Sequence, residues 1–271
     1  MPFWHNRGMP RLAANISYLY PDRPFLDRFA DAARDGFRGV ELDFPYEHGV
    51  HEIRARLKAY GLKLALFNAP PGDWAAGERG IASIPGREAE FRDGIALALE
   101  FARVLGNRMI QVMAGTVAPD EDRAPRREAF VRNLAWAAAE AANHGVTITI
   151  EPVNPVDFPE YLLTRQEEAH AILAEVGSSN LKVQLDLYHA RMVEGDLRGH
   201  LRTHIKGVGH VQVAGFPGRH EPDAGEIDVS ALFEQLDHLG YSGWIGCKYN
   251  PRGDTTRGLA WAQPWLDPRY W

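Results

Sequence analysis

The sequence contains one cysteine, Cys247, and this scarcity already limits the compartments in which the protein works. A single thiol cannot form a disulfide within the chain, and proteins poor in cysteine are typical of the reducing cytosol. Long apolar runs are lacking too, because no stretch approaches the roughly 18 residues needed to span a bilayer. The first residues, MPFWHNRG, lack the apolar centre of a signal peptide. We therefore expect a cytoplasmic protein without a membrane partner.

Basic residues are in the minority, with 30 Lys and Arg against 36 Asp and Glu and a net charge of −6. This balance argues against a general nucleic-acid-binding surface. The chain also has no linker-like or low-complexity stretch, so we expect one domain over residues 1–271. Met9 opens a segment that fits the start of the fold better than Met1 does. Residues 1–8 are therefore expected to be either native or an N-terminal extension.

Short apolar runs alternate with amphipathic stretches along the whole chain. Eight strands are predicted, over Leu12–Ser17, Gly39–Asp43, Lys63–Phe67, Met109–Met113, Thr147–Glu151, Lys182–Asp186, His210–Val213 and Trp244–Tyr249. Helices are predicted between them, over Phe25–Asp35, Glu52–Tyr60, Arg87–Leu105, Arg126–His144, Gln166–Val176 and Val229–Leu239. Thr164 and Glu167 have the spacing of a capping box. Strict alternation indicates a parallel sheet.

Side-chain parity favours a closed barrel over an open doubly wound sheet. Along the later strands, Glu151, Asp186, Gln212 and Lys248 all fall on the opposite face from the apolar residues beside them. An open sheet covered by helices on both faces would be apolar on both. No G-x-G-x-x-G follows the first strand, which removes the main support for a dinucleotide fold. The sequence therefore predicts an α/β fold consisting of a single (β/α)8 TIM barrel.

The same four polar residues lie near the C-terminal ends of their strands, where such barrels carry out chemistry. The two carboxylates and the amide of Glu151, Asp186 and Gln212 offer oxygen ligands, which suit Mg²⁺ or Mn²⁺. Alternatively, each is an interior polar residue held by its neighbours. A zinc cluster is less favoured, because few histidines lie at the strand ends.

Three further residues are candidates for binding a substrate. His189 follows the sixth strand and could contact a substrate oxygen or carry a proton, unless it is a surface histidine. Arg219 could pair with a substrate carboxylate through its planar fork, unless it is a solvated loop residue. Asn68 ends the third strand. The loops Asn68–Gly86 and Ala214–Asp228 follow strands at the same face and are long enough to cover a ligand.

Four segments, TITIEPVN, QLDLYH, HVQVAGFPGRHEP and GYSGWIGCKYNP, resemble the hydroxypyruvate isomerase family of xylose-isomerase-like barrels. The resemblance runs from about residue 11 to residue 261. It implies a TIM barrel, a divalent metal, and interconversion of hydroxypyruvate with 2-hydroxy-3-oxopropanoate (tartronate semialdehyde); some relatives act on 2-oxo-tetronate instead. By position, Glu151 resembles the first acid/base and metal ligand, and Asp186 and Gln212 resemble metal ligands. His189 and Arg219 resemble substrate contacts.

Lys248 departs from the family pattern, which has a glutamate there as metal ligand and second acid/base residue. An ammonium has no lone pair to donate. At about 4 Å and an effective dielectric near 20, it would repel each unit of metal charge by roughly 4 kcal/mol. Lys248 could fill the metal's place between Glu151 and Asp186, act as a neutral base if burial lowers its pKa, or point away as an inactivating substitution. Metal binding is accordingly expected to be weak or absent.

The leading hypothesis is an aldose–ketose-type isomerase acting on a small hydroxy-carbonyl acid, with Glu151 and Lys248 at the catalytic positions. A C3 sugar epimerase is the nearest rival. Two further hypotheses are a catalytically impaired sugar-acid-binding relative and an apurinic-site endonuclease, of which the second is opposed by the charge balance. Trp261, Trp265 and Trp271 are expected to pack under the barrel or at an interface between subunits, so a homo-oligomer stays open.

Overall fold

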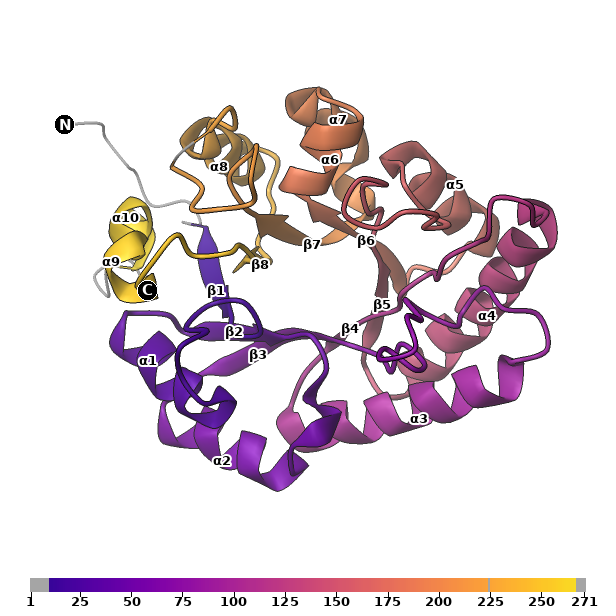
Figure 1. Cartoon of the computed structure of the whole chain (residues 1–271), viewed down its shortest axis with the longest axis horizontal. Helices are drawn as coiled ribbons and strands as arrows, with labels where there is room; N and C mark the ends of the chain where they lie inside the picture. Colours follow the sequence, from indigo (N-terminus) through magenta and orange to yellow (C-terminus); the bar gives the residue numbers. More distant parts are fainter. Residues whose placement is uncertain (1–9, 224, 267–271) are drawn as a thin grey trace.

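The computed structural model describes residues 10–223 and 225–266. Eight parallel strands close into a barrel in chain order, with helices around them (Figure 1). The strands are β1 Arg11–Asn15, β2 Gly39–Leu42, β3 Lys63–Asn68, β4 Met109–Gln111, β5 Thr147–Ile150, β6 Leu181–Asp186, β7 Val208–Val213 and β8 Trp244–Cys247. The predicted (β/α)8 TIM barrel is confirmed, and each predicted strand overlaps one of these eight.

Pairing between the first and last strands closes the sheet. Arg11 to Ala14 of β1 lie in register with Trp244 to Cys247 of β8, and β1 pairs on its other side with β2. Since all neighbouring strands are parallel, their C-terminal ends meet at one end of the barrel. The predicted polar strand ends are therefore gathered on a single face.

The helices of the outer layer agree with most of the predicted ranges. They are α1 Arg28–Arg34, α2 Val50–Ala59, α3 Glu88–Leu105, α4 Arg123–Asn143, α5 Gln166–Val176, α6 Leu187–Val193, α7 Leu197–His204, α8 Val229–His238, α9 Thr255–Gly258 and α10 Gln263–Leu266. Four 3-10 turns accompany them in the described part of the chain: η1 Phe25–Asp27, η2 Pro45–Glu47, η3 Ile205–Gly207 and η4 Leu259–Ala262.

Two local expectations differ from the structure. Sequence periodicity did not predict α6 and α7, which together connect β6 to β7 and are only 7 and 8 residues long. The capping box is wrong, because α5 begins after Arg165 without a side-chain cap. The backbone amide of Thr164 donates instead to the carboxylate of Glu168, at 3.3 Å.

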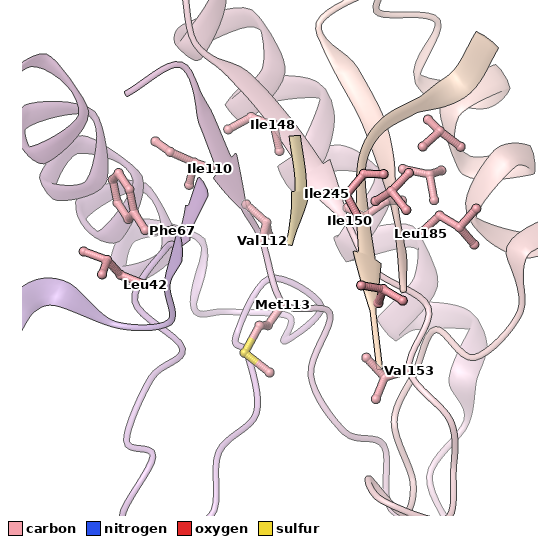
Figure 2. Packing of buried hydrophobic residues seen from close by; sticks show 14 of the residues in the cluster. Leu42, Phe67, Ile110, Val112, Met113, Ile148, Ile150, Val153, Leu185 and Ile245 are labelled. Atoms are coloured by element: carbon pink, nitrogen blue, oxygen red, sulfur yellow. The ribbon is translucent and has the colours of Figure 1, made fainter. Parts of the chain in front are cut away.

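The barrel separates apolar from polar side chains as the parity predicts. Apolar strand residues such as Ile110, Ile148, Leu185 and Ile245 belong to one buried cluster with residues of the surrounding helices (Figure 2). The opposite parity is polar and equally buried, in Glu41, Thr149, Gln184, His210 and Gln212. Hydrogen bonds join several of these polar residues across strands that are not neighbours, so they face the barrel interior.

The C-terminal segment closes the helical layer between α8 and α1 (Figure 1). Trp265 packs edge-on against Phe233 of α8, with ring centroids 5.1 Å apart, and Trp261 packs in the same way against Tyr249. These two tryptophans are thus part of the fold, while Trp271 and residues 1–8 lie outside the described residues. Among the described helices, none combines the length and the apolar character needed to cross a bilayer.

Candidate functional site

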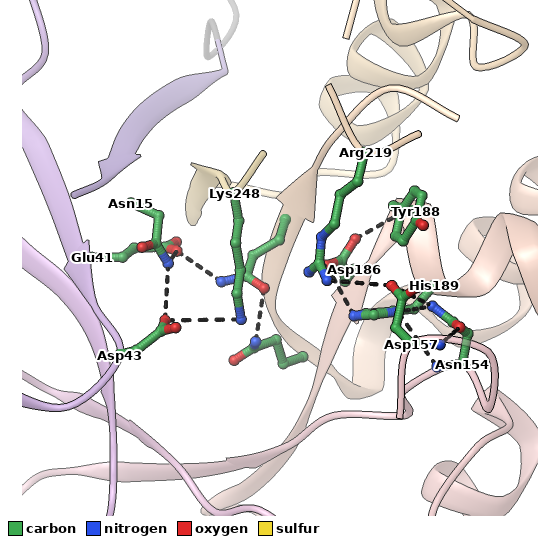
Figure 3. Close-up of polar contacts among 12 residues, drawn as sticks. Asn15, Glu41, Asp43, Asn154, Asp157, Asp186, Tyr188, His189, Arg219 and Lys248 are labelled. Carbon is green, nitrogen blue, oxygen red and sulfur yellow. Dashed lines mark hydrogen bonds and ion pairs between the residues drawn. The ribbon is translucent and has the colours of Figure 1, made fainter. Parts of the chain in front are cut away.

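The candidate site lies at the C-terminal ends of β5, β6, β7 and β8 and on the segments that follow them. Its members are called the strand-end cluster: Glu151, Asp186, His189, Arg219 and Lys248. All five residues are buried, and none is more than 7% exposed. Figure 3 shows Lys248 between the Asn15–Glu41–Asp43 group on one side and the Asp186–Arg219–His189 group on the other.

Two carboxylates and an imidazole converge within this cluster. Ligand atoms of Glu151, Asp186 and His189 all lie within 4.8 Å of one another, which confirms the predicted approach of the first two. Asp186 caps α6 by accepting a hydrogen bond from the amide of Tyr188 at 2.9 Å. His189 follows Tyr188 in the first turn of this helix, and its ring faces Asp186, with Nε2 3.6 Å from Asp186 Oδ2.

The imidazole of His189 is held on both sides. Its Nδ1 lies 2.6 Å from the side-chain nitrogen of Asn154, opposite the Asp186 carboxylate. Burial lowers the pKa of His189 to about 3, against which the Asp186 charge acts only in part. A neutral ring can serve as a ligand or as a hydrogen-bonding partner for a substrate oxygen.

Arg219 reaches the cluster from the loop after β7. Its backbone adopts a left-handed conformation with φ 56°, directly after Gly218, which also has a positive φ. Nη2 donates to Asp186 Oδ2 at 3.1 Å, and Nη1 lies 3.6 Å from Asp157. The guanidinium also lies 5.1 Å from the ring centroid of Tyr188.

Asp186 carries its negative charge despite complete burial. Burial by itself would raise the pKa of Asp186, but the Arg219 guanidinium, the Lys248 ammonium and the hydrogen bond from the Tyr188 amide bring it below the usual value. The guanidinium makes the direct contact, so Arg219 is the main cationic partner of Asp186.

Lys248 points into the cluster rather than away from it. Its side chain is 9% exposed, and Nζ lies 3.9 Å from Asp43 Oδ1 and 5.7 Å from the ring centroid of Tyr18. Burial lowers the pKa of Lys248, but the charges of Glu151 and Asp43 outweigh it and leave the pKa above the usual lysine value. This geometry favours a charged ammonium over a neutral base. It also pairs Lys248 with Asp43, not with Asp186 as the bridging interpretation expects.

Glu151 is the carboxylate with unsatisfied bonding capacity. Its Oε1 is buried without a hydrogen-bond partner among the described residues. Burial and the neighbouring charge of Asp186 raise the pKa of Glu151 to about 7, while Lys248 and Arg219 pull it down. A carboxyl that titrates near neutrality can both accept and return a proton at physiological pH.

Gln212 is hydrogen-bonded to other polar residues of the barrel interior. Its Nε2 donates to Glu41 Oε2 at 2.7 Å, and its Oε1 accepts from Gln184 Nε2 at 2.9 Å. Glu41 also accepts from Asn15 at 3.2 Å and contacts His210. His189 lies with the two acidic residues, a position that sequence reasoning did not give it, and the role of Gln212 as a metal ligand stays a prediction. The interior network was not predicted, because its contacts span strands that parity alone does not bring together.

The remaining expected residue, Asn68, ends β3 at the same end of the barrel. It pairs in register with Gln111 of β4, and its carbonyl accepts a hydrogen bond from the Tyr46 hydroxyl at 2.7 Å. Asp43, which follows β2, enters the site as the partner of Lys248 although sequence reasoning assigned it no role. The change of charge at Lys248 was the one available signal for such an acidic partner.

The cluster has mixed suitability for the divalent metal that the resemblance implies. Two carboxylates, an imidazole and the orphaned Glu151 Oε1 are donors that a divalent ion accepts. Two cationic side chains, Lys248 and Arg219, already face the same carboxylates within the same buried space. With Lys248 inside the cluster, the residues present do not fit a divalent ion.

A closed parallel barrel with buried carboxylates at its C-terminal strand ends defines the class of α/β-barrel enzymes. Within that class, residues 29–268 match the family described as xylose isomerase-like TIM barrel. The chain belongs to this family, and within it to the hydroxypyruvate isomerase group.

Three relatives illustrate the similarity. A 2-oxo-tetronate isomerase from Cupriavidus necator is 58% identical over 95% of this chain and 99% of its own. A hydroxypyruvate isomerase from Escherichia coli is 42% identical over 95% of this chain and 100% of its own. A crystal structure titled AP endonuclease, family 2, from Brucella melitensis superimposes with a TM-score of 0.94 at 47% identity, covering 96% of this chain and 100% of that one.

Proposed function

We propose that this protein is an aldose–ketose-type isomerase acting on a small hydroxy-carbonyl acid. A four-carbon 2-oxo-tetronate is the favoured substrate and hydroxypyruvate, interconverted with 2-hydroxy-3-oxopropanoate, is the second. This order of preference follows sequence identity to two relatives. The chain is 58% identical to a relative named 2-oxo-tetronate isomerase and 42% identical to one named hydroxypyruvate isomerase. Small anionic substrates also agree with the two buried cations of the cluster.

The observation that carries the proposal is the state of Glu151. Isomerisation moves a proton between adjacent carbons through an enediolate, which needs a base that is free near neutral pH. Glu151 has a buried oxygen without a partner among the described residues and a pKa raised to about 7. In the proposed reaction Glu151 removes the proton from one carbon and returns it to the neighbouring carbon, while the hydroxyl proton passes between the two oxygens.

Arg219 is the proposed partner of the substrate carboxylate. Its guanidinium is buried, and it already binds the carboxylate of Asp186 at 3.1 Å. A substrate carboxylate could use the remaining N–H groups of the planar fork. His189 is neutral and accepts from the Asn154 amide at Nδ1, so its proton lies on Nε2, which would donate to a substrate oxygen.

Lys248 supplies positive charge for the enediolate oxygens in this proposal, but it is a poor replacement for a second carboxylate. Its raised pKa keeps the ammonium protonated at neutral pH, so it cannot accept a proton there. We therefore expect slow isomerisation by the chain as it stands, because a single positioned base serves both carbons.

Two rival functions have weaker support. A sugar-acid-binding protein without turnover would use the same cations and is separated from the enzyme by assay alone. One solved relative is titled an AP endonuclease, which would favour an endonuclease. The net charge of −6 and the burial of the strand-end cluster disfavour a DNA substrate.

The test is to follow 2-oxo-tetronate and hydroxypyruvate separately by proton NMR in heavy water. An isomerase incorporates solvent deuterium at the carbon that is reprotonated and forms the isomeric product. Glu151→Gln should abolish both signals in a folded protein. Product formation at an unchanged rate in Glu151→Gln would contradict the assignment of Glu151 as the base, and the absence of product from both acids would contradict the isomerase.

A further inference from the structure

The position of Lys248 is fixed by its backbone as well as by its charge. Its amide donates to the carbonyl of Val213 at 3.2 Å, which extends the pairing of β8 with β7 by one residue. The preceding residue, Cys247, faces the apolar side and is fully buried. Period-two geometry then directs the Lys248 side chain toward the barrel interior. The ammonium is therefore built into the site by the strand and is not a surface group folded inward.

The ammonium lies in the same buried cluster as the residues that would hold a divalent ion. Glu151, Asp186 and His189 present ligand atoms within 4.8 Å of one another. Figure 3 shows Lys248 between Asp43 on one side and Asp186 with His189 on the other. Glu151 is the first of the acids whose charge acts on the Lys248 ammonium, and Asp43 is the second, 3.9 Å away. Asp43 thus makes the direct contact with the ammonium, while Glu151 acts on it over a longer distance.

The acidic residues of the site are balanced by side chains of the chain itself. Arg219 pairs with Asp186 at 3.1 Å, and Lys248 pairs with Asp43 and acts on Glu151. A divalent ion entering here would add two positive charges next to two that are already buried. Like charges in a site with little water repel strongly. The ammonium also offers no lone pair, so it cannot join the coordination sphere.

The expected amide ligand is directed elsewhere as well. Gln212 uses its nitrogen for Glu41 and its oxygen for Gln184, at 2.7 and 2.9 Å. Rotating the amide toward an ion would leave Glu41, which is fully buried, with one hydrogen bond fewer. A divalent ion would therefore need Lys248 to leave and Gln212 to turn.

We propose that the ammonium group of Lys248 is the resident cation of this barrel: paired with Asp43 and buried beside the strand-end carboxylates, it takes the place of a divalent ion, so that the site works without metal. The inference concerns binding of a cation and not turnover, so it holds or fails separately from the proposed isomerase activity.

The test is binding of Mn²⁺ to the chelator-treated full chain, followed by loss of the free Mn²⁺ signal in electron paramagnetic resonance. We compare wild type with Lys248→Glu, Lys248→Met and Lys58→Glu. Lys58 is an exposed residue of α2, so its replacement makes the same change of charge away from the site. Lys248→Glu should bind one Mn²⁺ per chain at least about 100-fold more tightly than wild type. Lys58→Glu should behave as wild type.

Lys248→Met separates the loss of the positive charge from the gain of a ligand. It should bind Mn²⁺ more weakly than Lys248→Glu and more tightly than wild type. Melting temperatures of all four proteins, with and without Mn²⁺, show that each variant is folded and repeat the comparison by a second measurement. Binding by wild type within about threefold of Lys248→Glu would overturn the proposal, because the ammonium would then leave room for the ion. So would tight binding by Lys248→Met equal to that of wild type.

Discussion

Glu41 and His210 are hydrogen-bonded across the interior of the barrel, from β2 to β7, although two other strands separate them in the sheet. The Glu41 carboxylate also accepts from Gln212 at 2.7 Å and from Asn15 at 3.2 Å, and it is fully buried. One carboxylate therefore ties three strands together beneath the strand-end cluster. We interpret this network as the support that fixes the orientation of Gln212.

Replacing Glu41 should lower the free energy of unfolding by more than the loss of the packing contacts of its side chain alone would. Glu41→Ala leaves the buried polar groups of His210, Gln212 and Asn15 without a partner, so we expect a loss of about 3–5 kcal/mol in the free energy of unfolding. Glu41→Gln keeps the shape and some of the hydrogen bonds and should cost less. Urea unfolding of both variants checks this. Equal losses would show that the interactions of the ionised carboxylate, and not the cavity, account for the effect, because Glu41→Gln leaves no cavity.

Gly246 of β8 provides the space for this carboxylate. A Cβ placed there would overlap Glu41 Oε1, well inside van der Waals contact. Gly246→Ala should therefore destabilise wild type by about 1–3 kcal/mol through overpacking. In a Glu41→Ala background the same change should cost much less, because the clashing atoms are gone. Equal costs in the two backgrounds, measured by urea unfolding, would contradict the contact.

The barrel and the convergence of the acidic residues could be predicted from the sequence because both follow from local rules. Alternating parity and the spacing of βα units were enough to place Glu151 and Asp186 at the same end. The side-chain partners were harder, since they depend on distances across the barrel and on loop conformation. Sequence alone left open whether Lys248 points inward, and it assigned Gln212 rather than His189 to the acidic ligands. The short helix that carries His189 had too few turns to show a helical period.

Lys248→Glu should raise the rate of isomerisation. The substitution supplies a second carboxylate opposite Glu151 and removes a positive charge that disfavours a divalent ion. Loss of one positioned acid/base group typically costs about 10²–10⁴-fold, so a gain of that order is expected in the presence of Mn²⁺. Steady-state assays with 2-oxo-tetronate and hydroxypyruvate measure it.

A control within this experiment uses the base that remains. Glu151→Gln in the Lys248→Glu background should remove the gained activity while circular dichroism shows an intact fold. If wild type already turns over at a full enzymatic rate, and Lys248→Met eliminates its pH dependence, Lys248 itself is the working base and the prediction is wrong.

Arg219→Lys should weaken substrate binding more than it slows the reaction. Lysine keeps the charge but loses the planar fork, and its compact ammonium cannot contact Asp186 and a substrate carboxylate in the same way. We expect KM to rise about tenfold or more with a smaller change in kcat, measured in the Lys248→Glu background where activity is expected to be higher. A fall in kcat with an unchanged KM would place Arg219 in the chemical step instead.

The raised pKa of Glu151 predicts how stability depends on pH in the chelator-treated protein. Burial, the first cause, moves this pKa from 4.5 to about 7 in the folded state. A carboxyl whose folded pKa is raised binds its proton more tightly when folded, so it contributes stability below about pH 4.5 and loses it as pH rises to about 7. The shift corresponds to a loss on the order of 3 kcal/mol across this window.

Urea unfolding is measured at intervals from pH 4.5 to 8. The free energy of unfolding of wild type should decline more steeply with pH than that of Glu151→Gln. The glutamine variant loses the attraction between Glu151 and Lys248, so its absolute stability changes, but the Glu151 contribution to the slope disappears. Glu128→Gln is the matched control, because Glu128 is an exposed carboxylate of α4 with a side chain that is 71% accessible. It should follow the wild-type curve.

If Glu151→Gln keeps the wild-type slope, the Glu151 carboxyl titrates in the folded protein much as it does in the unfolded chain. Its proposed role as a base matched to neutral pH would then lose its physical support.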